Sequence, residues 1–206
     1  MQQICDSRLV AILRHVPLAQ LSQTVEALYV GGVRCIEIAA DSPETLDGVK
    51  MLAQQWGDRM LVGAGTVLTR EAARQYVDAG ACFILSPIYD EAVIKETLDV
   101  GALPIPGIYT PTEAMQAVRY GATMVKLFPA VTVGSAFIRQ VLAPLPELQI
   151  MAVGGVDVDN AAAFIAAGAV AVGIGSQLAN LKLIEADDFT ALQARAEAFV
   201  HAVSGI

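Results

Sequence analysis

The chain repeats one structural unit about eight times. Short apolar runs recur along the sequence, and stretches of helical length with one apolar face lie between them. Most runs are followed by Gly, Pro, Ser or Thr, which is typical of buried parallel strands. The predicted strands are Leu9–Leu13, Cys35–Ala39, Met60–Gly63, Phe83–Ser86, Leu103–Pro106, Met124–Phe128, Ile150–Val153 and Ala171–Gly175.

The stretches between these runs have helix signals at their ends. Thr110 precedes Pro111 and stands three residues before Glu113, the pattern of a capping box with proline in the first turn. Glycines end several stretches, as left-handed helix caps do, at Gly31, Gly80, Gly101, Gly121 and Gly168. The predicted helices are Leu18–Val30, Pro43–Trp56, Arg70–Ala79, Glu91–Val100, Pro111–Tyr120, Ser135–Leu142, Asn160–Ala167 and a last one from about Asp188 to Val203.

Strands that alternate with helices in this number predict a (β/α)₈ TIM barrel, and residues 1–206 suit a single domain of this kind. An open, doubly wound sheet is the alternative. No Gly-x-Gly-x-x-Gly motif follows the first predicted strand, which disfavours a dinucleotide-binding version of that sheet. The sequence shows no linker, low-complexity tract or second domain.

The composition limits the partners of such a barrel. Apolar residues make up 55% of the chain and charged residues 17%, so part of the surface is expected to be apolar and to lie between subunits of an oligomer. The net charge of −8 comes without a basic block, which disfavours nucleic acid and anionic membranes as partners. A small anionic ligand is still compatible, because backbone N–H groups can hold it locally.

The sequence predicts a cytoplasmic protein. Its three cysteines, Cys5, Cys35 and Cys82, are odd in number and widely spaced, as expected of free and mostly buried thiols in a reducing compartment. The first residues include an acid and lead into no long apolar stretch, unlike a signal peptide. No apolar run reaches the about 18 residues that a transmembrane helix needs.

Two ionisable residues, Lys126 and Glu37, lie inside apolar predicted strands. Because side chains alternate along a strand, both are expected to face the barrel interior while their apolar neighbours face the helices. A lysine buried there loses its charge and can form a Schiff base with a carbonyl substrate, and a nearby carboxyl can move the protons. The alternatives are that Lys126 points outward between helices, and that Glu37 merely neutralises it.

Polar groups at other strand ends predict an anion-binding mouth, since active sites of TIM barrels lie at the carboxyl ends of the strands. Arg14 follows the first predicted strand and can bind carboxylate or phosphate, unless it is an ordinary surface arginine. Thr66 follows two glycines after the third strand, in a segment that lets a ligand approach the backbone or only makes a tight turn. Glycine-rich loops stand where such barrels bind phosphate, after the seventh and eighth strands, at Gly154, Gly155, Gly175 and Ser176.

Metal chemistry has little support. His15 and His201 are the only histidines, and no His, Asp and Glu residues cluster at the spacing of metal ligands. The sequence therefore predicts an active site without a metal or another cofactor.

Several motifs occur in an order that resembles one known family. Taken together and over nearly the whole chain, they resemble the 2-keto-3-deoxy-6-phosphogluconate (KDPG) aldolases and their 6-phosphogalactonate relatives, the class I, lysine-type KDPG/KHG aldolase family. The motifs are I-E-I around Glu37, G-A-G-T-V at 63–67, S-P at 86–87, P-G-I-x-T-P-T-E at 106–113, V-K-L-F-P at 125–129, V-G-G-V at 153–156 and G-I-G-S at 173–176.

This resemblance implies a carbon–carbon lyase that cleaves a phosphorylated 2-keto-3-deoxy sugar acid to pyruvate and D-glyceraldehyde 3-phosphate, and it implies a homotrimer. Lys126 would form the imine, and Glu37 would move protons. Arg14 and Thr66 would hold the pyruvyl carboxylate. The pocket would be shaped by Pro87, Phe128, Pro129 and Val153, and the phosphate would be held by Gly154, Gly155, Gly175 and Ser176.

Two positions depart from the phosphogluconate pattern. Many phosphogluconate members carry Glu-x-Thr-x-Arg after the second strand, whereas here Asp41 stands where that arginine would be. Arg14 is therefore expected to bind the carboxylate without it. Val153 replaces the threonine of a Thr-Gly-Gly sequence, and this form favours the phosphogalactonate relatives, because the loss of a hydroxyl can change the preference between epimers.

Two other functions fit the same barrel. A sugar-phosphate isomerase or epimerase would use Lys126 only as an electrostatic group and would release no pyruvate. A non-catalytic sugar-phosphate sensor would be stabilised by its ligand without turnover. The inward-facing pair Lys126 and Glu37 argues against the sensor.

Overall fold

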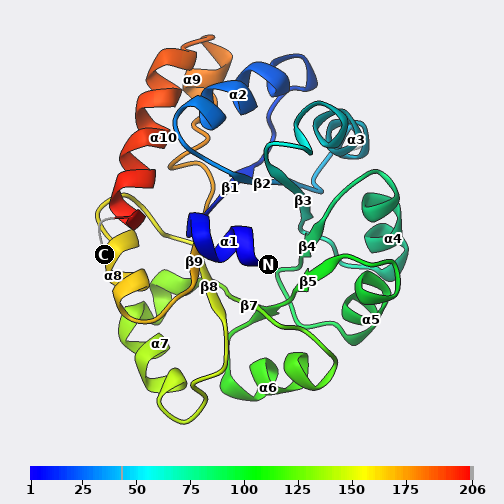
Figure 1. Ribbon diagram of the computed structural model, residues 1–206, viewed down its shortest axis with the longest axis vertical. Coiled ribbons are helices and arrows are strands. Elements are labelled where there is room, and N and C mark those ends of the chain that lie inside the picture. Colours follow the sequence, from blue (N-terminus) through cyan, green and yellow to red (C-terminus); the bar gives the residue numbers. More distant parts are fainter. Residues whose placement is uncertain (43, 205–206) are drawn as a thin grey trace.

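The structure is a computed structural model that describes residues 1–42 and 44–204. A ring of strands stands at its centre, and helices surround the ring (Figure 1). Neighbouring strands are parallel, in the order β5-β4-β3-β2-β1-β9-β8-β7-β6. They are β1 (Leu9–Leu13), β2 (Cys35–Ala39), β3 (Leu61–Gly65), β4 (Phe83–Leu85), β5 (Leu103–Ile105), β6 (Gly107–Ile108), β7 (Val125–Leu127), β8 (Ile150–Val153) and β9 (Ala171–Ile174).

β5 and β6, which stand at the two ends of this strand order, are two parts of one interrupted strand. β5 ends at Ile105 and pairs with β4, whereas β6 begins at Gly107 and pairs with β7. Pro106 lies between them and has no N–H for the ladder, but its carbonyl accepts a hydrogen bond from the backbone N–H of Lys126 at 2.8 Å. The nine strand segments of the described residues thus form an eight-stranded barrel, which confirms the predicted fold. The prediction that the fifth strand ends at Pro106 is wrong, because the strand resumes after the proline.

The helices occupy the predicted stretches, within one or two residues at each end. Pro43, the predicted first residue of the second stretch, lies outside the described residues. Two short helices, α1 and α9, were not predicted. The helices are α1 (Gln2–Ser7), α2 (Leu18–Val30), α3 (Thr45–Trp56), α4 (Arg70–Asp78), α5 (Glu91–Asp99), α6 (Pro111–Arg119), the 3₁₀ turn η1 (Ala130–Thr132), α7 (Gly134–Leu142), α8 (Ala161–Ala166), α9 (Leu181–Glu185) and α10 (Phe189–Ser204).

The helix signals are confirmed with one correction. Thr110 Oγ1 accepts a hydrogen bond from the N–H of Glu113 at 3.3 Å, and the Glu113 carboxylate accepts one from the N–H of Thr110 at 2.7 Å, as in a capping box. The predicted glycine caps have positive φ except Gly31, whose φ is −71°. At that turn the left-handed residue is Gly32, with φ 96°.

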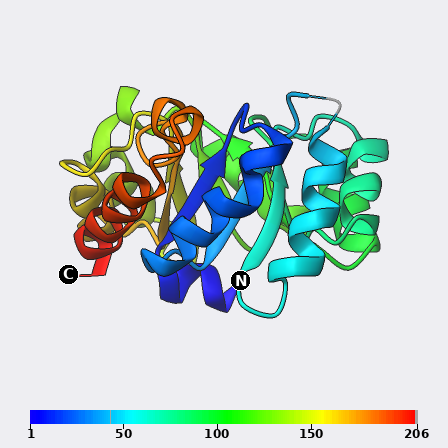
Figure 2. The same cartoon turned by 90° about the horizontal axis from the view of Figure 1, so that it is seen from above.

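Apolar side chains fill two layers, one between the strands and the helices and one inside the ring. The inner layer contains Val10, Phe83, Met124 and Met151, together with Ile4 from α1. α1 lies across the middle of the ring in Figure 1 and at its lower edge in Figure 2. It closes the end of the barrel where the strands begin, which leaves the carboxyl ends of the strands for a site.

The cysteines are free, and Cys35 is buried, Cys5 half-buried and Cys82 exposed. The prediction of mostly buried thiols is therefore wrong for Cys82, which lies in the turn just before β4. Burial raises the pKa of the Cys35 thiol to about 11, so this thiol is poorly nucleophilic. Among the described residues, no helix is both long enough and apolar enough to span a membrane.

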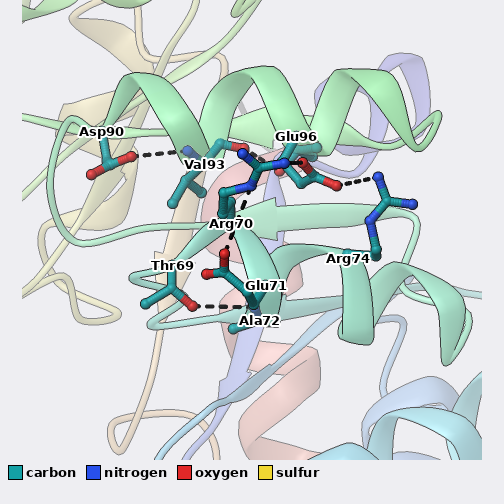
Figure 3. A network of polar contacts seen from close by, with 9 residues as sticks. Thr69, Arg70, Glu71, Ala72, Arg74, Asp90, Val93 and Glu96 are labelled. Atoms are coloured by element: carbon teal, nitrogen blue, oxygen red, sulfur yellow. Dashed lines mark hydrogen bonds and ion pairs between the residues drawn. The ribbon is translucent and has the colours of Figure 1, made fainter.

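A buried carboxylate joins α4 to α5 on the outside of the barrel (Figure 3). Glu96 of α5 is 5% exposed, and its Oε2 accepts a hydrogen bond from Arg70 Nη2 at 3.1 Å. Its Oε1 is in ion-pair contact with Arg74. Both arginines belong to α4 and keep most of their side chains exposed. The carboxylate therefore holds two neighbouring helices together.

Replacing Glu96 with glutamine is expected to lower the free energy of unfolding by about 1–2 kcal/mol, because two charge-assisted contacts of a buried group are lost. The exposure of both arginines limits the loss, since water screens their charges. Chemical denaturation measures the change. Glu91→Gln is the control, because Glu91 is an exposed partner of Lys95 on the same helix and should leave stability nearly unchanged. Equal losses in the two variants would contradict this prediction.

Candidate active site

A cavity of about 690 Å³ opens at the carboxyl ends of the strands. Every predicted site residue except Pro129 lines it, although the loops that carry them are far apart in the sequence. The predicted residues in its wall are Arg14, Glu37, Thr66, Pro87, Lys126, Phe128, Val153, Gly154, Gly155, Gly175 and Ser176.

Lys126 lies in the wall of this cavity, in the middle of β7. Its neighbours Val125 and Leu127 are buried in the outer apolar layer, whereas Met124 belongs to the inner layer. The alternation of the strand therefore turns Lys126 inward, as predicted, and not outward between helices. The residue is 5% exposed, and its Nζ lies 4.9 Å from the centre of the Phe128 ring.

The electrostatic surroundings of Lys126 favour a neutral amine. Burial lowers the pKa of the Lys126 amine; the carboxylate of Glu37 opposes this shift, and the guanidinium of Arg14 adds to it. Glu37 of β2 is 1% exposed, and within the described residues no hydrogen bond engages its Oε2. Burial raises the pKa of the Glu37 carboxyl, although Lys126 and Arg14 oppose that shift. The cavity thus holds an amine that can act as a nucleophile and a carboxyl that can take or give a proton.

Two glycines of β3 make room for these inward side chains. A methyl group at Gly65 would overlap the carboxyl of Glu37, and one at Gly63 would overlap the ring of Phe83. The sequence had suggested that these glycines let a ligand approach the backbone. The structure gives them a different role, because side chains from the neighbouring strands already occupy the space above them.

Replacing Gly65 with alanine is therefore expected to displace the Glu37 carboxyl. We expect kcat to fall at least about tenfold and the free energy of unfolding to fall by about 1–3 kcal/mol, as for other overpacked interiors. Steady-state kinetics and denaturant unfolding measure the two effects. Full activity in Gly65→Ala would show that the position of this carboxyl does not matter for the reaction.

Arg14 is held on both sides at the mouth of the cavity. Its Nη1 donates to Asp41 Oδ2 at 2.9 Å, and its Nη2 donates to Thr66 Oγ1 at 3.1 Å. Thr66 has φ 61°, which is rare for a β-branched residue and turns its hydroxyl to this contact. Arg14 and Thr66 thus lie together, as the carboxylate-binding hypothesis requires, and Asp41 directs the guanidinium.

The loops after β8 and β9 form the opposite part of the wall. Gly154 and Gly155 have φ of 93° and 76°, and a methyl group at Gly155 would overlap Val131. At Gly175 a methyl group would meet no atom within 4 Å, so the backbone there is open to the cavity. Such exposed backbone N–H groups, with the hydroxyl of Ser176 beside them, can hold a phosphate.

Pro129 does not line the cavity, in contrast to the predicted role. Its Cα lies 3.0 Å from the place of a methyl group at Gly154, whereas Phe128 lines the cavity. Pro129 therefore lies next to the loop after β8 but is not part of the cavity wall.

Several lining residues escaped the sequence analysis. His15 and Gln177 each follow a predicted site residue, and this adjacency was the available signal. Side chains alternate along β1, and this alternation could have identified Ile12, which stands two residues before Arg14. Val156 and Gly173 belong to the motifs V-G-G-V and G-I-G-S, and Gly173 lies in β9. Ala179 and Leu181 follow in the segment between β9 and α9 and at the start of α9, whose direction the sequence does not show. The additional lining residues are Ile12, His15, Val156, Gly173, Gln177, Ala179 and Leu181.

The fold and the cavity agree with a family match over most of the chain. The family described as KDPG and KHG aldolase matches residues 1–195. The chain belongs to the KDPG and KHG aldolase family. Membership of this family makes the protein an aldolase, a carbon–carbon lyase.

Relatives in the KDPG and KHG aldolase family include enzymes for both sugar epimers. A probable 2-dehydro-3-deoxy-6-phosphogalactonate aldolase from Rhizobium meliloti (strain 1021) is 37% identical over 171 residues, 82% of this chain and 81% of the relative. The 2-dehydro-3-deoxy-6-phosphogalactonate aldolase of Escherichia coli (strain K12) is 34% identical over 82% of this chain and 83% of its own. The 2-dehydro-3-deoxy-phosphogluconate aldolase of Treponema pallidum (strain Nichols) is 35% identical over 87% and 82%.

A solved structure of the KDPG and KHG aldolase family has the same fold. It is described as native KDPGal, is 32% identical, and superposes with a TM-score of 0.88 over 94% of this chain and 93% of that chain. Within the described part of the chain, no group of His, Cys, Asp and Glu residues is arranged to hold a metal ion.

Proposed function

We propose that this aldolase cleaves a 2-keto-3-deoxy-6-phospho sugar acid, of the gluconate or galactonate series, to pyruvate and D-glyceraldehyde 3-phosphate through a Schiff base on Lys126. One observation carries the proposal: Lys126 is a buried lysine in the cavity wall, close enough to the Glu37 carboxyl for the two pKa values to influence each other. A neutral amine is the form that attacks a keto carbon.

The reaction begins with attack of Lys126 Nζ on C2 of the substrate, which gives a carbinolamine. Loss of water leaves a protonated imine, which accepts the electron pair of the C3–C4 bond. Glu37 takes the proton of the C4 hydroxyl, directly or through water, while that bond breaks and the aldehyde leaves. The remaining enamine takes up a proton at C3, and water hydrolyses the imine to release pyruvate and the free lysine.

The rest of the cavity would bind the two anionic ends of the substrate. Arg14 and Thr66 would hold the carboxylate next to the keto carbon, because a guanidinium and a hydroxyl both donate to carboxylate oxygens. The backbone at Gly154, Gly155 and Gly175 and the hydroxyl of Ser176 would hold the phosphate. Pro87, Phe128 and Val153 would form the apolar walls between the two anionic ends.

A preference for the galactonate-derived substrate is supported by Val153 and by the two phosphogalactonate relatives. The test is pyruvate release, coupled to lactate dehydrogenase, with the gluconate- and galactonate-derived substrates side by side. We expect both to release pyruvate, and the galactonate epimer to have the higher kcat/KM. Conversion without pyruvate would indicate an isomerase or epimerase, and thermal stabilisation without any turnover would indicate a sensor.

A cytoplasmic homotrimer is the expected working form. Large apolar side chains are exposed around the carboxyl-terminal rim of the barrel, where a subunit contact would cover them, at Leu68, Ile88, Tyr109 and Val131. Light scattering should give a mass three times that of the 21.6 kDa chain. A monomer mass would overturn this assembly.

A further inference from the structure

His15 is a cavity residue whose backbone is strained and whose role the reaction above leaves open. It follows Arg14 after β1 and has φ 56°, a left-handed conformation that costs a non-glycine residue about 1–2 kcal/mol. Its side chain is 60% exposed, so burial in the core does not compensate this cost. Strained residues of this kind cluster at ligand-binding positions.

The Asp41 carboxylate lies beside Nδ1 of the His15 ring. Nδ1 of His15 lies 3.6 Å from Oδ1 of Asp41, and Oδ2 of the same carboxylate accepts the hydrogen bond from Arg14. The Asp41 side chain is only 14% exposed, so it is a fixed anchor. Within the described residues no hydrogen bond engages Nε2 of His15, and this nitrogen is available to a ligand.

The topology places the loop that carries His15 beside the loop after β9, which is proposed to bind the phosphate. β1 pairs with β9 on one side and with β2 on the other. The loop after β9 contributes Gly175 and Ser176 to the same cavity as His15. Arg14, by contrast, is turned toward Thr66 after β3, on the side proposed for the carboxylate. His15 shares the Asp41 carboxylate with Arg14, but its Nε2 lies across the ring from Nδ1 and is therefore turned away from Asp41.

The charge distribution of the cavity indicates a role for His15. Among the described lining residues, the side chains that can carry a positive charge are Arg14, Lys126 and His15. In the proposed reaction Lys126 bonds to the keto carbon and Arg14 holds the carboxylate. A phosphate dianion at the glycine loops would then meet N–H and O–H groups, and His15 is the remaining described lining side chain that can carry a positive charge.

We propose that His15 is a specificity-determining residue: its ring, protonated on both nitrogens when the phosphate is bound, donates from Nε2 to the substrate phosphate and makes the enzyme prefer phosphorylated over unphosphorylated keto acids. This inference rests on the proposed aldolase function and adds a side-chain contact to the backbone cradle. Asp41 is the positioning residue that holds the ring for this contact.

The test compares kcat/KM for the 6-phospho substrate with kcat/KM for the same sugar acid without phosphate. We expect His15→Gly and His15→Asn to lower the ratio of the two values at least tenfold in favour of the unphosphorylated acid, chiefly through KM for the phosphorylated one. Both replacements tolerate positive φ, so neither should lower the melting temperature. Asp187→Gly is the control, since Asp187 has φ 53° outside the cavity lining and should keep the wild-type ratio.

The outcomes separate this inference from the function on which it rests. If the wild type releases pyruvate and prefers the phosphorylated acid, but both His15 variants keep that preference, His15 does not contact the phosphate and the inference is overturned. If the wild type releases no pyruvate from either acid, the proposed function itself is wrong. A lowered ratio in Asp187→Gly as well would attribute the effect to the backbone and would also overturn the inference.

Discussion

Replacing Lys126 with arginine is expected to abolish aldol cleavage, with kcat lowered at least about 10⁴-fold. Arginine keeps the positive charge, but its guanidinium stays protonated in proteins and offers no free amine to the keto carbon. The variant therefore separates covalent catalysis from simple electrostatics, which an isomerase would use. Pyruvate release coupled to lactate dehydrogenase, with both epimers as substrates, measures the loss. Turnover within tenfold of the wild type would exclude Lys126 as the nucleophile.

Borohydride reduction in the presence of pyruvate tests the bond directly. Reduction of the imine should add a stable pyruvyl mass, and peptide mass spectrometry should locate it at Lys126. Lys50→Arg is the matched control, because Lys50 is an exposed lysine on α3 and its replacement should keep both turnover and adduct. An adduct at another lysine, or none in the wild type, would contradict the assignment.

The stability of a Lys126→Met variant should show how much free energy of unfolding the wild type loses by burying the Lys126 amine. Because the folded state lowers the pKa of Lys126 below 10.5, the unfolded state binds the lysine proton more tightly. The stability of the wild type therefore rises with pH from that lowered pKa up to about 10.5. Lys126→Met has no such proton, so its stability should change less over this range. Denaturant unfolding of both proteins at several pH values measures the difference in slope.

The barrel could be predicted because its signals are local. Each strand is a short apolar run, several helices have an N-terminal cap or a closing glycine, and the alternation within β7 and β2 turns Lys126 and Glu37 inward wherever those strands lie. The carboxyl-end rule for TIM barrels then brings these two residues together with Arg14 and the glycine loops. None of these steps needs the identity of a distant neighbour.

Other features that sequence reasoning missed depend on such neighbours. Gly65 is required by the carboxyl of Glu37, which lies on the adjacent strand. The direction of Arg14 is set by Asp41 and Thr66, from the ends of two other strands. Pro106 is typical of a strand end, but the ladder resumes beyond it because the backbone N–H of Lys126 donates to the Pro106 carbonyl. Contacts between segments distant in sequence decided each of these points.

Replacing Glu37 with glutamine is expected to lower kcat by about 10²–10⁴-fold, the range for loss of a general acid and base. Glutamine has nearly the same shape and fits above Gly65, but it cannot take the proton of the C4 hydroxyl. The borohydride adduct with pyruvate should still form at Lys126, more slowly, because imine formation does not break a carbon–carbon bond. Glu26→Gln, at an exposed position of α2, is the control and should leave kcat unchanged.

The pH dependence of the same variant gives Glu37 its sharpest test. Burial raises the pKa of Glu37 from 4.5, so the wild type should lose kcat as the pH falls through that raised value, and Glu37→Gln should lack this limb of the profile.

The free energy of unfolding depends on pH in the opposite direction to kcat. The folded state holds the Glu37 proton more tightly than the unfolded state, so this carboxyl lowers stability as the pH rises from 4.5 through its raised pKa. Glutamine has no such cost, and Glu37→Gln should be at least as stable as the wild type at neutral pH while nearly inactive. If Glu37→Gln unfolds more easily than the wild type, Glu37 has a structural role instead. The loss of stability would mean that the Glu37 carboxylate stabilises the folded state.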